Sequence, residues 1–364
     1  MRSTRQGGRV RSLPLDAPAA QACYFDDVFA AFLNAERLAG SIARDFLIGG
    51  GRIRVRFAGD ALVSLLSRAL AHLSCDASAE PDLTICVWDS ASTGVALPDA
   101  PATIRQFLAR REMSGVSGER FIAAFDFAER MRLSVLYRQQ RAAIHWIPDA
   151  PSIPFYEQAA PFLQILHWWA REHRHQIVHA AAVGTAAGGV LIGGKSGSGK
   201  STTTLTCLKA GLRSPGDDYT LLCVAQPPLV RSLYSTGKLE GPHLLRSLPS
   251  LMPAVSNQDR MHRDKAVLFL HEHYPEALIG EFPVRAVVLP RISAGGRCRL
   301  IETSPAAAVA AIAPSTMIQL RWSGSEDLRR IAAVVRAVPN YILELGDDLD
   351  EIPVLIRGLL EKAA

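Results

Sequence analysis

The chain has 364 residues, of which 48% are hydrophobic and 21% are charged, a balance typical of a globular protein with about two domains. No uncharged apolar run of about 18 residues occurs, so the sequence predicts no membrane-spanning helix. The net charge of +5 suits a phosphate ligand, but Lys and Arg do not cluster between aromatic residues, and we expect no nucleic-acid partner. The 6 scattered cysteines form no CxxC pair, which indicates reduced thiols rather than disulfides or zinc.

The N-terminal part of the chain divides into a basic arm and an α+β domain. Residues 1–24 begin with several arginines and lack the apolar segment of a secretory signal, so we expect a flexible arm on a cytoplasmic protein; a contact arm for an acidic partner is the alternative. Residues 25–150 mix strand and helix patterns; Ile53, Val55 and Phe57, for example, share one face of a predicted strand. This domain holds no catalytic motif, and we expect it to recognise the substrate.

Residues 151–364 are predicted to form a second domain of α/β type. It begins with a helix over 155–173 that carries Trp168 and Trp169, which we interpret as core residues rather than a ligand site. Strand patterns follow at 177–178 and 190–192. The second of these strands runs directly into a glycine-rich segment.

That segment is a predicted phosphate-binding loop. Residues 194–201 read GKSGSGKS and match the Walker A pattern G-x-x-x-x-G-K-[ST], with a strand pattern before them and helix-compatible sequence after them. The glycines let successive backbone N–H groups face phosphate oxygens, while a lysine and a serine suit the β- and γ-phosphates and Mg²⁺. The sequence therefore predicts a site for ATP and Mg²⁺ made by Gly194, Lys195, Ser196, Gly197, Ser198, Gly199, Lys200, Ser201 and Thr202.

An acidic pair follows the phosphate loop in the chain. Asp217 and Asp218 lie between a Pro-Gly turn and a strand pattern at 219–224, where the sheet could bring them beside the loop. One carboxylate could hold Mg²⁺, and the other could accept the proton of a hydroxyl nucleophile. A solvated turn is the alternative interpretation of this segment.

Three features of residues 176–225 resemble the HPr kinase/phosphorylase family, whose P-loop fold is related to phosphoenolpyruvate carboxykinase. They are His179 on a short strand before the P-loop strand, the Walker A motif and the acidic pair. The resemblance implies that His179 lies near the acidic pair and orients it or the phosphate. We accordingly predict His179, Lys200, Asp217 and Asp218 as catalytic, with Asp217 as the base and Asp218 with Ser201 as metal ligands; the reverse assignment of the two aspartates stays open.

Most of the chain also resembles HPr-kinase-like proteins of peptide natural-product clusters, particularly the lasso peptide tailoring kinases. The shared layout includes the strand at 51–59, the tryptophan-containing helix, the phosphate loop and a Leu-Pro-Arg segment at 289–291. The resemblance implies transfer of the γ-phosphate of ATP to a serine hydroxyl, namely that of the C-terminal serine of a lasso precursor peptide. The alternatives are an HPr-type protein serine kinase and a nucleotide-binding sensor without phosphotransfer.

Several other residues are weaker candidates. Lys238 and Lys265 could contact a phosphate, and Arg285 and Arg291 could neutralise transferred charge. The segment 271–273 reads His-Glu-His, an alternation that predicts a strand with both histidines on one face and not a zinc-binding H-E-x-x-H helix. The chain lacks the Asn-Lys-x-Asp segment of GTPases and the LSGGQ-like segment of transporter ATPases.

Overall fold

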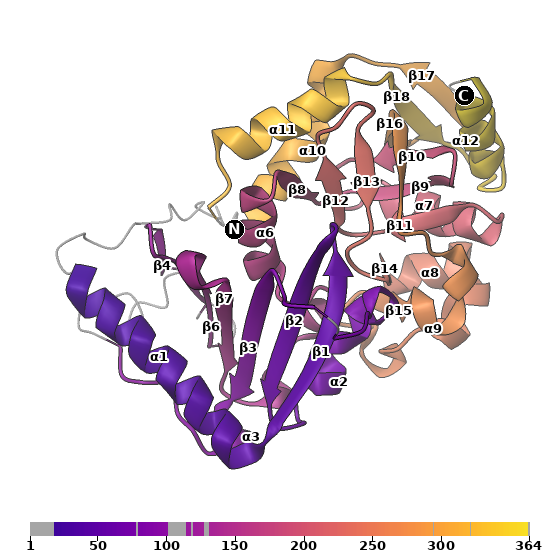
Figure 1. The fold of residues 1–364 in the computed structure, drawn as a ribbon. Helices are drawn as coiled ribbons and strands as arrows, with labels where there is room; N and C mark the ends of the chain where they lie inside the picture. Colours follow the sequence, from indigo (N-terminus) through magenta and orange to yellow (C-terminus); the bar gives the residue numbers. More distant parts are fainter. Residues whose placement is uncertain are drawn as a thin grey trace, which may run out of the picture. The chain divides into compact units, whose positions relative to one another are not determined.

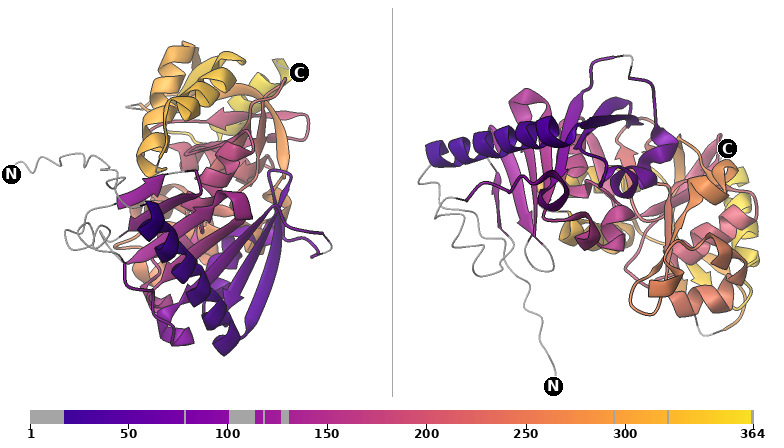
Figure 2. Two further views of the ribbon diagram at one scale, coloured as in Figure 1. Left: turned by 60° about the vertical axis from the view of Figure 1, so that its left-hand side comes forward. Right: turned by 90° about the horizontal axis from the view of Figure 1, so that it is seen from below.

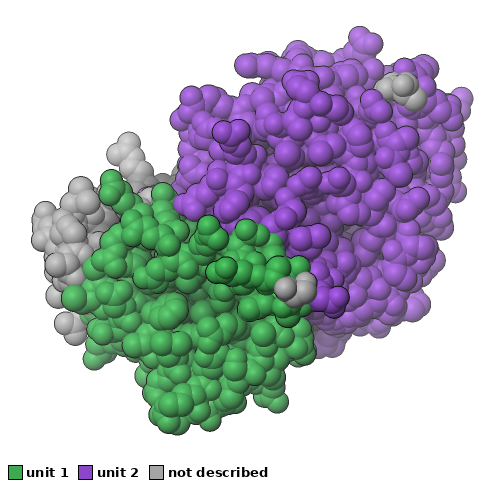
Figure 3. Space-filling view, in the orientation of Figure 1, with its two compact units in different colours: residues 1–45, 52–65, 77–153 green, residues 46–51, 66–76, 154–364 purple. Residues whose placement is uncertain are grey.

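The computed structural model describes residues 18–77, 79–100, 114–117, 119–126, 131–293, 295–320 and 322–362. The chain combines helices with parallel and antiparallel strands, which confirms the α/β class (Figure 1). It divides into two compact units, the first made of residues 1–45, 52–65 and 77–153 and the second of residues 46–51, 66–76 and 154–364 (Figure 3). Within the described ranges, no helix combines the length and the apolar character needed to cross a bilayer.

The first unit is built around a seven-stranded sheet and one long helix, α1 (Pro18–Ala39). Residues 18–24 of the predicted arm belong to this helix, and residues 1–17 lie outside the described residues. The strand order is β1-β2-β3-β7-β6-β5-β4, in which β2, β3 and β7 run parallel and the later pairs antiparallel. The strands are β1 (Ser41–Ile48), β2 (Gly51–Ala58), β3 (Leu83–Asp89), β4 (Ser114–Ser117), β5 (Phe121–Asp126), β6 (Arg132–Tyr137) and β7 (Ala142–Ile147).

One apolar face of α1 explains how this unit folds. Phe25, Val28 and Phe32 are fully buried at helical spacing and pack with Trp88 and Trp146 of the sheet. The rotated views show α1 lying along the sheet (Figure 2). This unit therefore has its own core.

The second unit is organised by β16 (Glu281–Ile292), a strand long enough to pair with three partners. Its first part pairs antiparallel with β13 (Leu229–Arg231), and its later part runs parallel to β10 (Gly188–Ile192) and to β18 (Asn340–Leu345). The whole sheet has nine strands in the order β11-β9-β10-β16-β13-β12-β8, with β18 and β17 branching from β16. The other strands are β8 (His175–Val178), β9 (Ala181–Thr185), β11 (Arg213–Gly216), β12 (Thr220–Cys223) and β17 (Arg299–Glu302).

Helices cover both faces of this sheet (Figure 1). On one face, α10 (Pro305–Gln319) and α11 (Ser325–Arg336) bury residues such as Ile312 and Val335 against the strands. On the other face, α7 (Lys200–Lys209) and α12 (Glu351–Lys362) bury residues such as Cys207 and Ile356. The strands β8 and β10 of this sheet are buried throughout, as expected for their apolar patterns in the sequence, whereas β17 is mostly exposed.

The helix predicted over 155–173 is interrupted. It forms as α5 (Phe155–Gln158) and α6 (Leu163–Glu172), because Pro161 cannot donate a helical hydrogen bond and Phe162 adopts a left-handed conformation with φ of 58°. Trp168 and Trp169 of α6 are 2% and 3% exposed, so the prediction that they are core residues is confirmed.

A small two-stranded sheet lies beside α7 in the same unit. β14 (Thr236–Leu239) pairs with β15 (Ala266–Phe269), and Leu205 of α7 packs in the same apolar cluster. The chain between them forms α8 (Gly241–Ser247), and α9 (Leu270–His273) follows β15. The predicted strand through the His-Glu-His segment is therefore wrong: β15 ends at Phe269, and the segment turns into one short helix.

Candidate active site

The predicted phosphate loop connects β10 to α7. β10 is a fully buried strand in the middle of the sheet, and α7 begins at Lys200 directly after the loop. The loop thus ends at the N-terminus of a helix of 10 residues, where free N–H groups and the helix dipole favour a phosphate. The strand, loop and helix that would confirm the Walker A motif are all present.

Glycines in the loop are required by its backbone. Gly194, Gly197 and Gly199 have φ of 147°, 78° and 105°, a region that residues with a side chain rarely occupy. A Cβ on Gly199 would also lie 2.3 Å from Cδ1 of Leu345 on β18. The sequence pattern of the loop therefore reflects backbone shape and close packing as well as ligand binding.

Lys200 is held inside the loop that precedes it. Its Nζ donates to the carbonyl oxygens of Gly194, at 2.8 Å, and Lys195, at 3.3 Å, and the residue is 7% exposed. Burial lowers the pKa of this ammonium, and the nearby Asp218 and Asp217 carboxylates partly restore it. The lysine charge is thus placed at the centre of the loop, facing the region where phosphates would lie.

Strand register brings His179 and the acidic pair together. His179 lies at the junction of β8 and β9, and the two aspartates lie at the junction of β11 and β12. β12 pairs with β8 and β11 pairs with β9, with Thr220 opposite Val178 and Gly216 opposite Ala182. The two junctions therefore face each other across the sheet, which explains why residues about 40 positions apart share one site.

Asp218 forms two charge-assisted contacts. Its Oδ1 lies 3.1 Å from Nε2 of His179, and its Oδ2 accepts a hydrogen bond of 2.7 Å from Nζ of Lys238 on β14. Burial alone would raise the pKa of Asp218, but Lys238 and His179 outweigh burial and hold it well below its usual range. Asp218 is therefore an ionised carboxylate that lines the cavity.

Asp217 lies deeper and faces a different neighbour. It is 1% exposed, and its Oδ2 accepts a hydrogen bond of 3.1 Å from the backbone N–H of Lys238. Burial raises its pKa, opposed by that N–H and by the nearby hydroxyls of Ser201 and Thr204. Its Oδ1 is buried and has no hydrogen-bond partner among the described residues, a costly arrangement unless a cation or a donor binds there.

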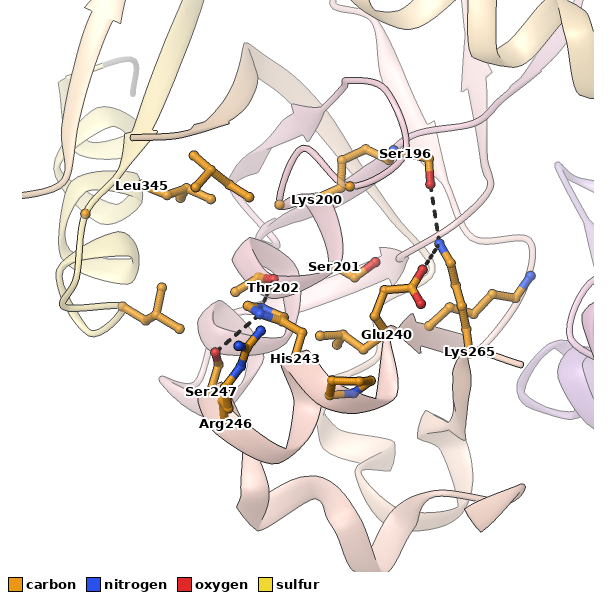
Figure 4. Close-up of a pocket in the computed structure, with 18 of the residues that line it drawn as sticks. Ser196, Lys200, Ser201, Thr202, Glu240, His243, Arg246, Ser247, Lys265 and Leu345 are labelled. Atoms are coloured by element: carbon orange, nitrogen blue, oxygen red, sulfur yellow. Dashed lines mark hydrogen bonds and ion pairs between the residues drawn. The ribbon is translucent and has the colours of Figure 1, made fainter. Parts of the chain in front are cut away.

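The residues around the phosphate loop line a cavity of about 960 Å³. Figure 4 shows the loop residues Ser196, Lys200 and Ser201 on one side and α8 with His243 and Arg246 on the other. Lys265 bridges the cavity wall, with Nζ 3.5 Å from Oγ of Ser196 and 3.4 Å from Oε1 of Glu240. The volume lies within the range of ligand pockets of small molecules and cofactors.

Ser201, which lines this cavity, and Asp217, which is not among its lining residues, are the candidate ligands for Mg²⁺. Among the described residues, no group of three or more His, Cys, Asp and Glu side chains converges on a point that could hold a metal ion. Mg²⁺ in nucleotide sites commonly takes only one or two protein ligands and completes its shell with phosphate oxygens and water. The Ser201 hydroxyl together with the unpartnered Asp217 Oδ1 supplies such a minimal set.

Two residues that no motif indicated contact the predicted site residues, and one of them, His243, also lines the cavity. His243 of α8 lies with Nε2 2.8 Å from the Thr202 hydroxyl, and Gln319 of α10 contacts Nδ1 of His179 at 3.3 Å. Both come from segments more than 40 positions beyond the phosphate loop, and neither carries a local signal in the sequence. Only the tertiary structure places them.

Of the four weaker candidates predicted from the sequence, the two lysines line the cavity and the two arginines do not. Lys238 and Lys265 both line the cavity. Arg285 and Arg291 are not among the described residues that line it: Arg285 donates to the carbonyl of Ala187, and Arg291 pairs with Glu344.

No family model matches the sequence, and no curated protein matches it. Among solved structures, the HPr(Ser) kinase/phosphatase from Coxiella burnetii is similar, with 11% sequence identity and a TM-score of 0.29 over 51% of this chain and 95% of that chain. These values do not establish a shared fold, so the predicted relationship to the HPr kinases and to lasso peptide tailoring kinases stays a prediction.

Proposed function

We propose that this protein is an ATP-dependent kinase that transfers the γ-phosphate to a serine hydroxyl of a peptide. The observation that carries the proposal is the meeting of Lys200, from the phosphate loop, and Asp218, from the acidic pair, in one cavity. A loop that only binds nucleotide needs no ionised carboxylate with two fixed partners beside the lysine. Phosphoryl transfer needs both positioning of the acceptor and stabilisation of the transferred charge.

The geometry favours the reverse of the aspartate roles preferred from sequence. Asp217 neighbours Ser201 and has a free buried oxygen, so in our proposal it belongs to the Mg²⁺ side with Ser201. Asp218 lines the cavity, so it faces the acceptor hydroxyl. The bound ion would neutralise charge on the β- and γ-phosphates.

The proposed reaction then has one chemical step. The serine Oγ bonds to the γ-phosphorus, the bond from that phosphorus to the β–γ bridging oxygen breaks, and ADP leaves. The serine proton passes to a carboxylate oxygen of Asp218, whose low pKa makes orientation of the hydroxyl more important than basic strength. Lys200 and Lys238 supply positive charge on either side of the transferred group.

The proposed acceptor follows from the sequence resemblance. The sequence resemblance favours the C-terminal serine of a lasso precursor peptide, and the described structure holds no feature specific to that peptide. The deciding experiment incubates the protein with ATP, Mg²⁺ and peptides that end in serine or in alanine, and measures peptide mass. We expect the mass gain of one phosphoryl group on the serine-ended peptide only. Binding of ATP without any transfer, on a panel of serine-containing peptides and HPr-type proteins, would instead identify a nucleotide sensor.

A further inference from the structure

The cavity extends from the phosphate loop over the ends of two further strands. β10 ends at Ile192, which lies opposite Val288 of β16, and β16 continues beside the parallel strand β18 as far as Ile292 and Leu345. Both of these end residues line the cavity, and Leu345 is the residue against which Gly199 of the loop packs. Ligands of α/β sheets bind outside the carboxyl ends of parallel strands, and these three strands end at the same edge.

This extension lies on the other side of the loop from the acidic pair. In the sheet, β10 lies between β9 and β16. Asp218 follows β11, the neighbour of β9, whereas the segment 345–350 follows β18, the neighbour of β16. In the proposed reaction the γ-phosphate faces Asp218. A triphosphate that lies along the loop would therefore direct its nucleoside toward the segment 345–350.

One wall of this space combines an apolar side chain with a carboxylate. Ile292 is 67% exposed and lines the cavity, so its apolar surface is available to a ligand. The segment 345–350 contains three aspartates, of which Asp347 accepts a backbone N–H at 3.1 Å and Asp348 accepts another at 2.9 Å. The Asp350 carboxylate has no hydrogen bond or ion pair within the described ranges, and it remains able to accept a hydroxyl of a ligand.

The opposite wall is α8. His243 of this helix contacts the Thr202 hydroxyl, and Arg246, three positions further on, is exposed and has no ion-pair partner in the described part of the chain. Figure 4 shows Leu345 and these two α8 side chains on opposite sides of Thr202. Thr202 belongs to the first turn of α7, where free backbone N–H groups bind phosphate. A sugar and a base attached to that phosphate would extend between the two walls.

We propose that the nucleoside half of the nucleotide binds between these walls, with its base between Arg246 and Ile292 and its ribose hydroxyls donating to Asp350. This inference rests on the proposed function, from which it takes the direction of the triphosphate. A guanidinium stacks on the face of any base, and an apolar side chain contacts any base. The carboxylate, in contrast, needs a hydroxyl donor. The ligand class is therefore a ribonucleotide, selected more strongly for its ribose than for its base.

The test is calorimetric titration of the full chain in the presence of Mg²⁺, with ATP, 2′,3′-dideoxy-ATP and tripolyphosphate as ligands. We expect the parent to bind ATP about tenfold more tightly than the dideoxy nucleotide. Asp350→Ala removes the acceptor, so the ratio of these two affinities should fall to about one. Arg246→Ala should weaken ATP binding about fivefold and leave the affinity for tripolyphosphate unchanged.

Matched variants control for charge and for effects at helix ends. Arg336 lies in the last turn of α11, as Arg246 lies in the last turn of α8, and Arg336→Ala should change neither affinity. Asp259 is exposed in the first turn of a short helix, and Asp259→Ala should keep the parent ratio of ATP to dideoxy-ATP affinity. The charge of Asp350 also favours the start of α12, but loss of that effect lowers Tm without altering the comparison of the two nucleotides.

The nucleoside placement would be overturned by a parent that binds ATP and dideoxy-ATP equally, or by a folded Asp350→Ala variant that keeps the parent ratio. Equal losses of ATP and tripolyphosphate affinity in Arg246→Ala would also overturn it, because the guanidinium would then bind the phosphates. Calorimetry measures binding alone. A protein with the expected affinities that transfers no phosphate would contradict the proposed function and leave the nucleoside site in place.

Discussion

The His179 imidazole and the Asp218 carboxylate meet across two strand junctions, with Nε2 3.1 Å from Oδ1. His179 lies where β8 passes into β9, and Asp218 lies where β11 passes into β12. Lys238 of β14 completes the arrangement on the second oxygen of the same carboxylate. These three residues line the same cavity as the lysine of the phosphate loop.

Replacing Asp217 and replacing Asp218 should impair different properties of the protein: the first its use of Mg²⁺, and the second its kcat. Asp217→Asn removes the charge beside Ser201, so we expect the Mg²⁺ concentration for half-maximal activity to rise about tenfold or more. Asp218→Asn should leave nucleotide affinity near that of the parent and lower kcat by about 100-fold. The measurements are Mg²⁺ titrations of activity and ATP binding by calorimetry, with Asp259→Asn, an exposed site, as control. An Mg²⁺ defect confined to Asp218→Asn would restore the assignment preferred from sequence.

Lys238 should control the acid side of the pH–rate profile. In the native site this lysine helps to hold the pKa of Asp218 well below its usual range, so the carboxylate stays ionised through mildly acidic pH. Lys238→Met removes the ammonium but keeps the backbone N–H that contacts Asp217, and the pKa of Asp218 should rise. Loss of activity on acidification should then begin at a higher pH than in the parent. An acid limb at the same pH in parent and variant would show that Asp218 does not govern it.

Gly199 should tolerate no side chain. Gly199→Ala combines a φ of 105° with a Cβ 2.3 Å from Leu345 Cδ1, and we expect a destabilisation of about 1–3 kcal/mol together with weaker ATP binding. Gly358 of α12 is the matched control, because its Cβ would meet nothing within 4 Å and alanine suits a helix interior. Urea unfolding and nucleotide titration of both variants make the comparison. Equal stability of the two variants would contradict the packing described for the loop.

His72 should make the second unit sensitive to acid. Burial, followed by the nearby His271, lowers the pKa of His72 to about 4, while an unfolded histidine titrates near 6.5. Between these values the unfolded chain binds more protons, so stability is full above pH 6.5 and falls as the pH drops toward 4, by at most about 1.4 kcal/mol per pH unit from this group. We expect His72→Gln, which can still reach the Ser232 hydroxyl, to show a shallower fall in Tm. The same slope in parent and variant would assign the acid sensitivity to other groups.

The sequence and the structure agree best where the determinants are local. The phosphate loop can be predicted because Gly194, Gly199 and Lys200 lie within one short segment whose backbone shape demands glycine. The contact of His179 with Asp218 depends on strand register between β8 and β12, which no local pattern specifies. Gln319 carries no signal at all, because an exposed glutamine at the end of a helix looks like any other.

Errors in secondary structure have equally physical causes. The His-Glu-His alternation around Glu272 has the period of a strand, but three residues are too few to exclude a turn of helix. The apolar pattern over 155–173 favours one continuous helix, but Pro161 lacks the N–H that continuity requires. Burial of Trp168 and Trp169 was predictable nonetheless, since large apolar side chains at helical spacing face the core.

The measurement closest to the central claim is single-turnover phosphoryl transfer from ATP to a serine-ended peptide by the Asp217→Asn/Asp218→Asn double variant, beside the parent and Lys200→Ala. Circular dichroism and Tm confirm that each variant is folded, and Lys362→Ala on the exposed end of α12 serves as the control. We predict phosphopeptide from the parent and the control, and a rate at least about 100-fold lower from the double variant and from Lys200→Ala. Phosphopeptide formed by the folded double variant at the parent rate would contradict the proposed roles of the two aspartates.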